Sequence, residues 1–290
     1  MDTLDFIKMH GLGNDFVILD GRHQAVLVDW LNDRQQAGLI SKLADRRCGI
    51  GFDQLLLLTD AATANPDAAE AEIGLQIFNS DGSHAAACGN GTRCVAEMVL
   101  GQSGGHSLSI ATIAGKLTAE RLDNGMISVC MGKARLDWQS IPLTHQADTM
   151  ALDIGAEVAA IAVNIGNPHA VLLVDDAETV DIARLGPGLE RHPVFADGAN
   201  IEWVHLLGPD RLRMRVWERG SGITRACGSG ACAAAIAAAR AGISGRQAEV
   251  VLDGGSLMIR WDEDDLVHMQ GPASRVFSGR LKLDDLMAEQ

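Results

Sequence analysis

The sequence of 290 residues contains no tyrosine, and its 24 lysine and arginine residues are outnumbered by 38 aspartates and glutamates. The absence of tyrosine removes one common general acid and makes cysteine more interesting for proton transfer. The formal charge of -14 opposes binding to nucleic acid, because phosphate contacts draw most of their affinity from lysine and arginine. We therefore expect no nucleic-acid partner.

Long apolar runs are missing as well. No stretch approaches 18 uninterrupted apolar residues, and the first residues, Met1 to Asp5, lack the basic and then apolar order of a signal peptide. We therefore expect a cytoplasmic protein that does not enter a membrane. With 47% hydrophobic residues, the chain is long enough for two packed domains.

The cysteines are few and widely spread, and with no export signal they argue against a disulfide framework. No Cys-x-x-Cys pair exists and no histidine stands at a usual ligand spacing from a cysteine, so we expect no metal site. Packing and catalysis remain as roles for the six: Cys48, Cys88, Cys94, Cys130, Cys227 and Cys232.

The chain repeats itself. The segment from Leu75 to Gly91 aligns without a gap on the segment from Met214 to Gly230, and this places Cys88 over Cys227. Each of these cysteines stands in a Cys-Gly-x-Gly sequence. The simplest account is two halves of one architecture, with an irregular linker over residues 133–160.

Short alternating apolar runs predict strands within each half. They cover residues 16–19, 55–58, 73–78, 107–111 and 126–131, and then 170–174, 201–207, 211–217 and 248–252. Helices are predicted after each Cys-Gly-x-Gly, over residues 92–100 and 231–241, and the second is so rich in alanine that burial on all sides is expected. The predicted fold class is therefore mixed α/β (α+β), with two pseudo-symmetric domains of curved strands wrapped around a central helix.

In a Cys-Gly-x-Gly sequence the two glycines let the backbone turn tightly and leave N–H groups open at the helix N-terminus. Such a helix end attracts a carboxylate. It also favours the thiolate form of the cysteine over the thiol. Two such ends supply what inversion at an α-carbon needs. One thiolate removes the proton and the opposing thiol delivers another, so the pair shares one proton. The sequence thus predicts a two-base epimerase that needs no cofactor, with Cys88 and Cys227 as its catalytic residues.

At these residues the chain resembles the diaminopimelate epimerase family almost from end to end. The segments that carry the resemblance are His10 to Phe16, Gly49 to Gln54, Phe78 to Ser83, Cys88 to Cys94, Gly166 to His169, Ala199 to Ile201, Glu218 to Gly220 and Ala226 to Cys232. Two positions depart from the family pattern: Trp217 stands where tyrosine is common, and Ile223 where glutamate is frequent.

The resemblance implies interconversion of LL- and meso-diaminopimelate, on the route to lysine and peptidoglycan, without pyridoxal phosphate or metal. It implies that His169 and Glu218 tune the cysteines, and that in the forward direction Cys227 accepts the proton and Cys88 donates one. Substrate binding is expected from Asn14, Gln54, Asn79, Gly89, Asn90, Asn167, Asn200, Glu218, Arg219, Gly228 and Ser229.

The resemblance also implies two similar halves with the active site in the cleft between them, and a C-terminus that returns to the first half. The expected domains are residues 1–132 with 274–290, and residues 133–273. Whether the chain forms a homodimer is left open.

Two other functions stay open. A proline or hydroxyproline racemase uses the same two-cysteine logic, although that family has a histidine where Asn90 stands here. A protein without catalytic activity is the other alternative, with the cysteines forming a redox switch or an interface. The remaining cysteines are expected in the core.

Overall fold

The computed structural model of the chain describes residues 3–23 and 36–282. The chain forms two compact units: unit 1 comprises residues 1–129 and 272–290, and unit 2 comprises residues 130–271. The predicted boundaries at 132/133 and 273/274 lie within a few residues of these. Of the predicted first half, residues 1–2, 24–35 and 283–290 lie outside the described residues.

Unit 1 is a curved sheet in the order β17-β1-β2-β3-β4-β6-β7, in which β2 with β3 and β4 with β6 are parallel and the other pairs antiparallel. Its strands are β1 (Thr3–Gly11), β2 (Asn14–Asp20), β3 (Gln54–Thr59), β4 (Ile73–Asn79), β5 (His84–Ala85), β6 (Ser107–Thr112), β7 (Gly115–Arg121) and β17 (Ser274–Lys282). Its helices are α2 (Gln36–Ala44), α3 (Ala61–Ala64) and α4 (Gly89–Ser103), with short 3-10 turns at Gly21–His23 and Pro66–Ala68. Strand β8 (Ile127–Lys133) runs across the boundary into unit 2.

Unit 2 repeats this pattern in the order β9-β10-β11-β12-β14-β15-β16, with β10/β11 and β12/β14 parallel and the other pairs antiparallel. Its strands are β9 (Ile161–Asn164), β10 (Pro168–Leu173), β11 (Asn200–Gly208), β12 (Arg211–Glu218), β13 (Gly222–Ile223), β14 (Gln247–Leu252), β15 (Gly255–Trp261) and β16 (Leu266–Gly271). Its helices are α5 (Ile182–Glu190) and α6 (Gly228–Arg240). The predicted α+β class, with one architecture present twice, is confirmed.

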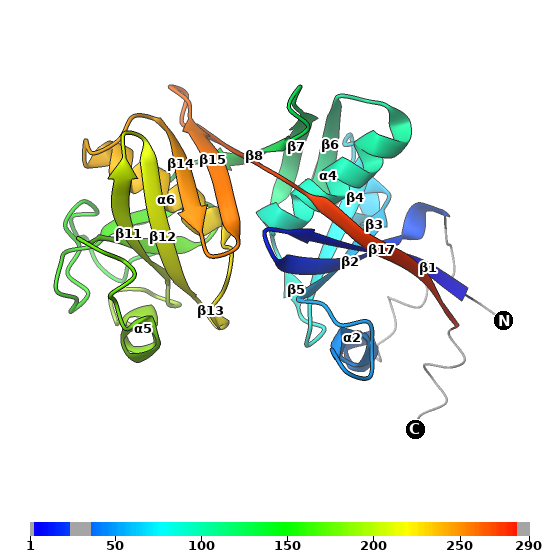
Figure 1. Cartoon of the computed structure of the whole chain (residues 1–290), viewed down its shortest axis with the longest axis horizontal. Helices are drawn as coiled ribbons and strands as arrows, with labels where there is room; N and C mark the ends of the chain where they lie inside the picture. The colour runs from blue at the N-terminus through cyan, green and yellow to red at the C-terminus, as the bar shows by residue number, and fades with distance from the viewer. Residues whose placement is uncertain (1–2, 24–35, 283–290) are drawn as a thin grey trace. The chain divides into compact units, whose positions relative to one another are not determined.

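Each sheet curves around one central helix, α4 in unit 1 and α6 in unit 2 (Figure 1). Every residue of α6 from Ala231 to Ala238 is buried, since alanine side chains allow strands to approach the helix from several directions. Helix α4 ends at Gly104, whose φ of 70° is the left-handed conformation that glycine adopts without strain. A buried helix of this kind fixes the position of the residue at its N-terminus.

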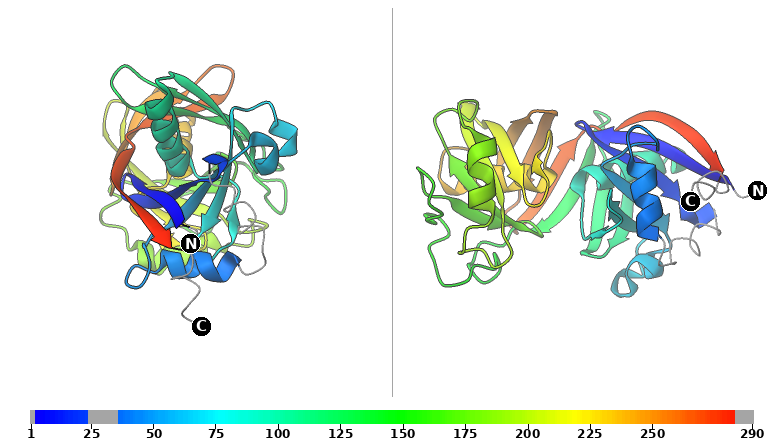
Figure 2. Two further views of the ribbon diagram at one scale, coloured as in Figure 1. Left: turned by 90° about the vertical axis from the view of Figure 1, so that its right-hand side faces the viewer. Right: turned by 90° about the horizontal axis from the view of Figure 1, so that it is seen from below.

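Several elements were not predicted. The C-terminal strand β17 pairs with β1 along its length, and Figure 2 shows the red strand beside the blue one. Its residues are mostly exposed, so its sequence lacks the alternation by which a half-buried strand is recognised. Helix α5 contains Gly186 and Pro187, which lower the helical signal. Strands β1, β5, β7, β9, β13, β15 and β16 and helices α2 and α3 were also missed.

Within the part of the chain that the structure describes, no helix is long and apolar enough to cross a membrane.

Candidate functional site

Cys88 is the N-cap residue of α4, with an extended backbone at φ -148° and ψ 101°. Its sulfur accepts a hydrogen bond from the main-chain N–H of Gly91 at 3.3 Å, and its carbonyl accepts one from the hydroxyl of Thr92 at 2.9 Å. The side chain is half-buried. The sulfur therefore stands where the open N–H groups and the dipole of the buried helix act on it.

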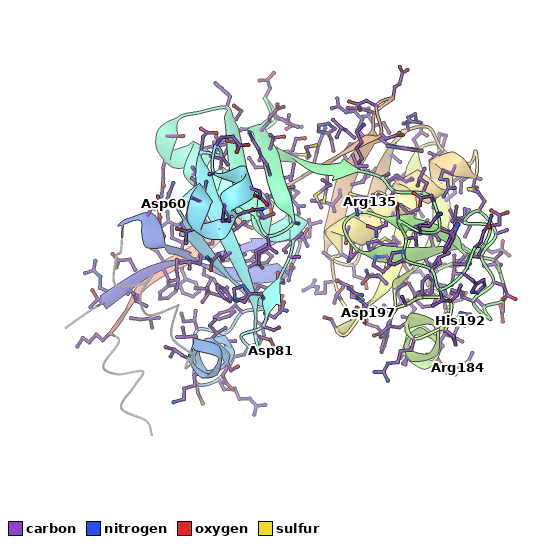
Figure 3. All side chains as sticks on the ribbon, turned by 180° about the vertical axis from the view of Figure 1, so that it is seen from behind. Asp60, Asp81, Arg135, Arg184, His192 and Asp197 are labelled. Carbon is purple, nitrogen blue, oxygen red and sulfur yellow. The ribbon has the colours of Figure 1, made fainter. Side chains whose placement is uncertain are left out.

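Amide side chains from three strands lie at the same end of unit 1. The side-chain N–H of Gln54, at the start of β3, donates to Asn79 Oδ1 at the end of β4 over 2.9 Å, as expected for residues paired in register. Asn79 in turn donates to Ser83 Oγ at 3.0 Å, in the turn that also holds Asp81 (Figure 3). Asn14, which begins β2, accepts from Asn90 Nδ2 at 3.4 Å. We call the set Asn14, Gln54, Asn79, Cys88, Gly89 and Asn90 the Cys88 site.

Charged side chains hold Asn14 in place. Its amide donates to Asp53 Oδ2 at 2.8 Å, and Arg46 bridges Asp53 and Asp15 with contacts of 2.7 Å to each. Burial would raise the pKa of Asp15, but hydrogen bonds from Arg46 and Lys8 outweigh it and lower the pKa to about 2. The loop before β3 is thereby fixed against the start of β2.

Cys227 is the N-cap residue of α6 and is 5% exposed. Its sulfur accepts from the main-chain N–H of Gly230 at 3.4 Å and lies 3.7 Å from the hydroxyl oxygen of Ser229. The two cysteines thus occupy equivalent positions in the two units.

The surroundings of Cys227 correct one expectation. The helix N-terminus alone was expected to favour its thiolate, yet the pKa of the Cys227 thiol is raised well above its usual value. Burial is the main cause, followed by the nearby carboxylates of Glu218 and Glu202; the hydrogen bonds from Gly230 and Ser229 act in the opposite direction. With its side chains as they stand, unit 2 keeps this sulfur protonated.

Glu218 lies beside Cys227 at the end of β12. Burial raises the pKa of its carboxyl, against hydrogen bonds from Thr224 and Cys227 that lower it. The Thr224 hydroxyl donates to Glu218 Oε1. Glu218 is therefore placed to exchange a proton with the sulfur.

Behind these residues, His169 and Glu202 form a fully buried pair with 2.7 Å between Nδ1 and Oε1. The other ring nitrogen, Nε2, lies 2.9 Å from Asn167 Oδ1. Asn167 follows Gly166, whose φ of 91° favours glycine; Gly13 stands in the same way before Asn14, with φ 86°.

Asn200 connects β10, β11 and the end of β12. Its amide donates to the carbonyl of Pro168 at 3.1 Å, and its oxygen accepts the main-chain N–H of Arg219 at 2.9 Å. The Arg219 guanidinium reaches the exposed Asp197, which Figure 3 labels, at 3.0 Å. We call the set Asn167, His169, Asn200, Glu218, Arg219, Cys227, Gly228 and Ser229 the Cys227 site.

The predicted site residues therefore gather in two places, one in each unit. The prediction that the other four cysteines lie in the core holds for two of them. Cys94 and Cys232 are fully buried as expected, and burial raises the pKa of Cys94 to about 12. The prediction that Cys48 lies in the core is wrong, because the turn after α2 exposes it, and Cys130 is only half-buried. Within residues 3–23 and 36–282, no three His, Cys, Asp or Glu side chains are arranged to hold a metal ion.

Sequence reasoning missed Glu202 and Arg93, both fully buried near the helix N-termini. Arg93 Nη2 donates to Asn90 Oδ1 at 3.0 Å and so orients that amide. Glu202 had a visible signal: it is a carboxylate within the apolar run after Asn200, two positions along the strand and so on the same face of the sheet.

The family model described as diaminopimelate epimerase matches residues 6–136 and 161–276. A diaminopimelate epimerase from Rhodospirillum centenum is 48% identical over 278 residues, which is 95% of this chain and 91% of that protein. One from Gluconobacter oxydans is 47% identical over 277 residues, with 96% of this chain and 98% of that protein covered.

Two solved structures show the same fold at low identity. A PhzF-family phenazine biosynthesis protein from Bacillus anthracis has a TM-score of 0.66 at 15% identity, with 98% of this chain and 100% of that chain covered. A hydroxyproline epimerase from Agrobacterium vitis has a TM-score of 0.64 at 16% identity, with 98% and 93% covered. The match over both units and the high identity to the named relatives lead to one conclusion: the chain belongs to the diaminopimelate epimerase family.

Proposed function

We propose that this protein interconverts LL- and meso-diaminopimelate, and that Cys88 and Cys227 are the base and acid of the reaction. The observation that carries the proposal is the equivalence of the two cysteines, each the N-cap of the central helix in a unit of the same strand order. The family supplies the substrate. The step would serve lysine and peptidoglycan precursor synthesis, and we place it in the cytoplasm, where the cysteines stay reduced.

In the proposed reaction a thiolate takes the α-proton, and the electron pair of the C–H bond moves into the α-carboxylate. The opposite thiol then gives its proton to the other face of the carbon, and the electron pair returns to form the new C–H bond. One proton is consumed and one released, so no cofactor is required. In reverse the sulfurs exchange roles.

The remaining residues have roles that follow from their chemistry. Main-chain N–H groups of Gly89, Asn90, Gly228 and Ser229 would bind the α-carboxylate as negative charge builds on it, and one such donor is worth about 3 kcal/mol of barrier. Arg219 would bind the distal carboxylate after leaving Asp197, with amide groups holding the amines. These amides are Asn14, Gln54, Asn79, Asn167 and Asn200.

The structure also suggests how His169 and Glu218 could tune the protonation of Cys227. Glu218 contacts Cys227 directly, and a carboxyl whose pKa is raised by burial can hold the proton that the thiol releases. We propose that His169 and Glu218 together set when Cys227 gives up its proton. In this proposal Cys227 accepts a proton from the substrate only after its thiol proton has moved to Glu218.

The test is exchange of the α-hydrogen in heavy water, measured by mass spectrometry with diaminopimelate and, separately, with proline. Exchange on diaminopimelate alone is expected. Exchange on proline alone would replace the proposal with a racemase of cyclic imino acids.

Cysteine variants test the residue roles. Cys88→Ala and Cys227→Ala should each abolish epimerisation with unchanged circular dichroism, while Cys48→Ala, at an exposed thiol, keeps wild-type turnover. Full turnover in either of the first two variants would rule out the two-thiol mechanism and favour a redox or structural role for that cysteine.

A further inference from the structure

The two units differ at two matched positions beside their central helices. In unit 1, β2 and β3 pair Phe16 with Gln54, and Leu56 lies two residues further on. In unit 2, β10 and β11 pair His169 with Asn200, and Glu202 lies two residues further on. A buried histidine and carboxylate thus replace the phenylalanine and leucine of the other unit.

The position next to the helix is the same in both. A Cβ placed on Gly91 would meet Leu56 at 3.1 Å and the Cys88 sulfur at 3.4 Å. A Cβ placed on Gly230 would meet Glu202 Oε1 at 2.8 Å and the Cys227 sulfur at 3.2 Å. Glu202 therefore brings a carboxylate to the place beside Cys227 where unit 1 has an aliphatic side chain.

The buried pair is neutral as a whole. Both ring nitrogens of His169 face oxygen atoms, Glu202 Oε1 and Asn167 Oδ1, so each contact requires a hydrogen. One hydrogen lies between Nδ1 and Glu202 Oε1 and the other between Nε2 and Asn167 Oδ1, and the carboxyl group of Glu202 also faces Gly230 beside the sulfur. Glu202 Oε2 is buried and has no hydrogen-bond partner among the described residues, which is a costly arrangement for a merely structural side chain.

Among the described residues of unit 2, Glu218 is the other carboxylate beside Cys227, and its charge raises the pKa of the thiol more than that of Glu202 does. Of the strands packed on α6, β12 supplies Glu218, which already contacts Cys227. The charged groups of β14, β15 and β16 form ion pairs instead: Glu249 with Arg211, and Arg260 and His268 with Asp262. Strand β9 has no ionisable side chain.

We propose that Glu202 is a positioning residue of the Cys227 site. It fixes the His169 ring against Asn167, and its carboxylate adds to burial and to Glu218 in keeping the Cys227 sulfur as a thiol in the protein without substrate. The inference deepens the proposed function and rests on it for the catalytic meaning. The protonation of Cys227 can be measured independently of any activity.

The first experiment follows the sulfur directly. Protein labelled with 13C at cysteine Cβ is titrated by NMR, with the Cys227 resonance assigned by its loss in Cys227→Ala. In the wild-type protein this resonance should keep its thiol position beyond the pH at which an ordinary cysteine thiol ionises. In Glu202→Gln and Glu202→Leu it should begin to move about one pH unit lower, because the adjacent negative charge is gone.

Two variants guard against misfolding, since glutamine keeps the shape of the side chain and leucine is what unit 1 carries at the matched position. Glu249→Gln is the matched control, a carboxylate removed from the same unit away from Cys227. An unchanged titration in both Glu202 variants, each with wild-type circular dichroism, would overturn the proposal.

The second experiment is a double-mutant cycle. Glu202→Gln should lower kcat/KM about tenfold in the wild-type background and by less than about twofold in a His169→Gln background, because Glu202 acts through the ring. Equal losses in both backgrounds would overturn the positioning role. If the wild-type protein itself exchanged no hydrogen on diaminopimelate, the proposed function would fail, while the titration would still decide the protonation of Cys227.

Discussion

Trp217 and Glu190 are joined by a hydrogen bond of 2.6 Å between the indole N–H and Oε2, at the point where β12 meets helix α5. The other carboxylate oxygen of Glu190 accepts the main-chain N–H of Gly220 at 3.1 Å. Glu190 therefore holds the chain on both sides of Glu218 and Arg219. The indole of Trp217 also lies against Gly186, where a Cβ would meet it at 2.4 Å.

Trp217→Phe should lower the free energy of unfolding by about 1–3 kcal/mol beyond the loss of packing, since it leaves a buried carboxylate oxygen without its donor. Trp261→Phe is the control, because the buried indole N–H of Trp261 has no partner among the described residues. Urea unfolding followed by circular dichroism compares the two. Equal losses would mean that the bond to Glu190 contributes nothing to stability.

Gly230→Ala should reduce turnover more than tenfold. The new Cβ would stand 2.8 Å from Glu202 Oε1, and that oxygen can withdraw only by breaking its contact with His169. Gly188→Ala, in helix α5 with nothing within 4 Å of its Cβ, should keep full activity and gain about 0.5–1 kcal/mol. Steady-state kinetics on both proteins check this, and an active Gly230→Ala would show that Glu202 has room to move.

Asp15→Asn should remove part of the acid sensitivity of the protein. The pKa of Asp15 is about 2 in the folded protein, against 3.8 for an unperturbed aspartate. The carboxylate therefore stabilises the folded state at neutral pH, and this contribution is lost as the pH falls from about 5 to 2. The shift corresponds to about 2 kcal/mol. Urea midpoints between pH 7 and pH 2 should therefore fall less in the variant than in the wild-type protein. Asp123→Asn, at an exposed position, should behave as wild type.

Glu218→Gln should abolish turnover and yet stabilise the protein at alkaline pH. Burial raises the pKa of Glu218 above 4.5, so the folded state favours the protonated form and loses stability as pH rises through that raised pKa. Glutamine removes this loss. Thr224→Val should lower the stability of the protein at alkaline pH, because it removes a hydrogen bond to the Glu218 carboxylate. Urea midpoints at pH 8 that are equal in all three proteins would contradict the argument.

The sequence predicted what depends on neighbours along the chain. The glycine turns at Cys88 and Cys227, the helices after them and most strands on which the amides lie all follow from local pattern. Strand β17 could not be predicted from its sequence, because its side chains are mostly exposed on both faces and show no alternation. Cys48 has no motif around it and was therefore expected in the core, but the turn after α2 exposes it.

The shift in the pKa of Cys227 could not be predicted from local sequence pattern. A helix N-terminus is visible in the sequence, but Glu202 lies 25 residues before the cysteine and comes close to it only because β11 packs against α6. Burial of the sulfur likewise depends on how the sheet of unit 2 closes around α6. The direction of the shift in its pKa therefore required the three-dimensional structure.

The pairing of β17 with β1 has a consequence for how the chain matures on the ribosome. Residues 130–271 are continuous, so unit 2 has all its strands as soon as β16 has been made. Strand β1 is translated long before β17, the strand that covers its outer edge. The nascent chain therefore carries an open sheet edge while all of unit 2 is being made, and unit 1 is completed only after the strands of unit 2.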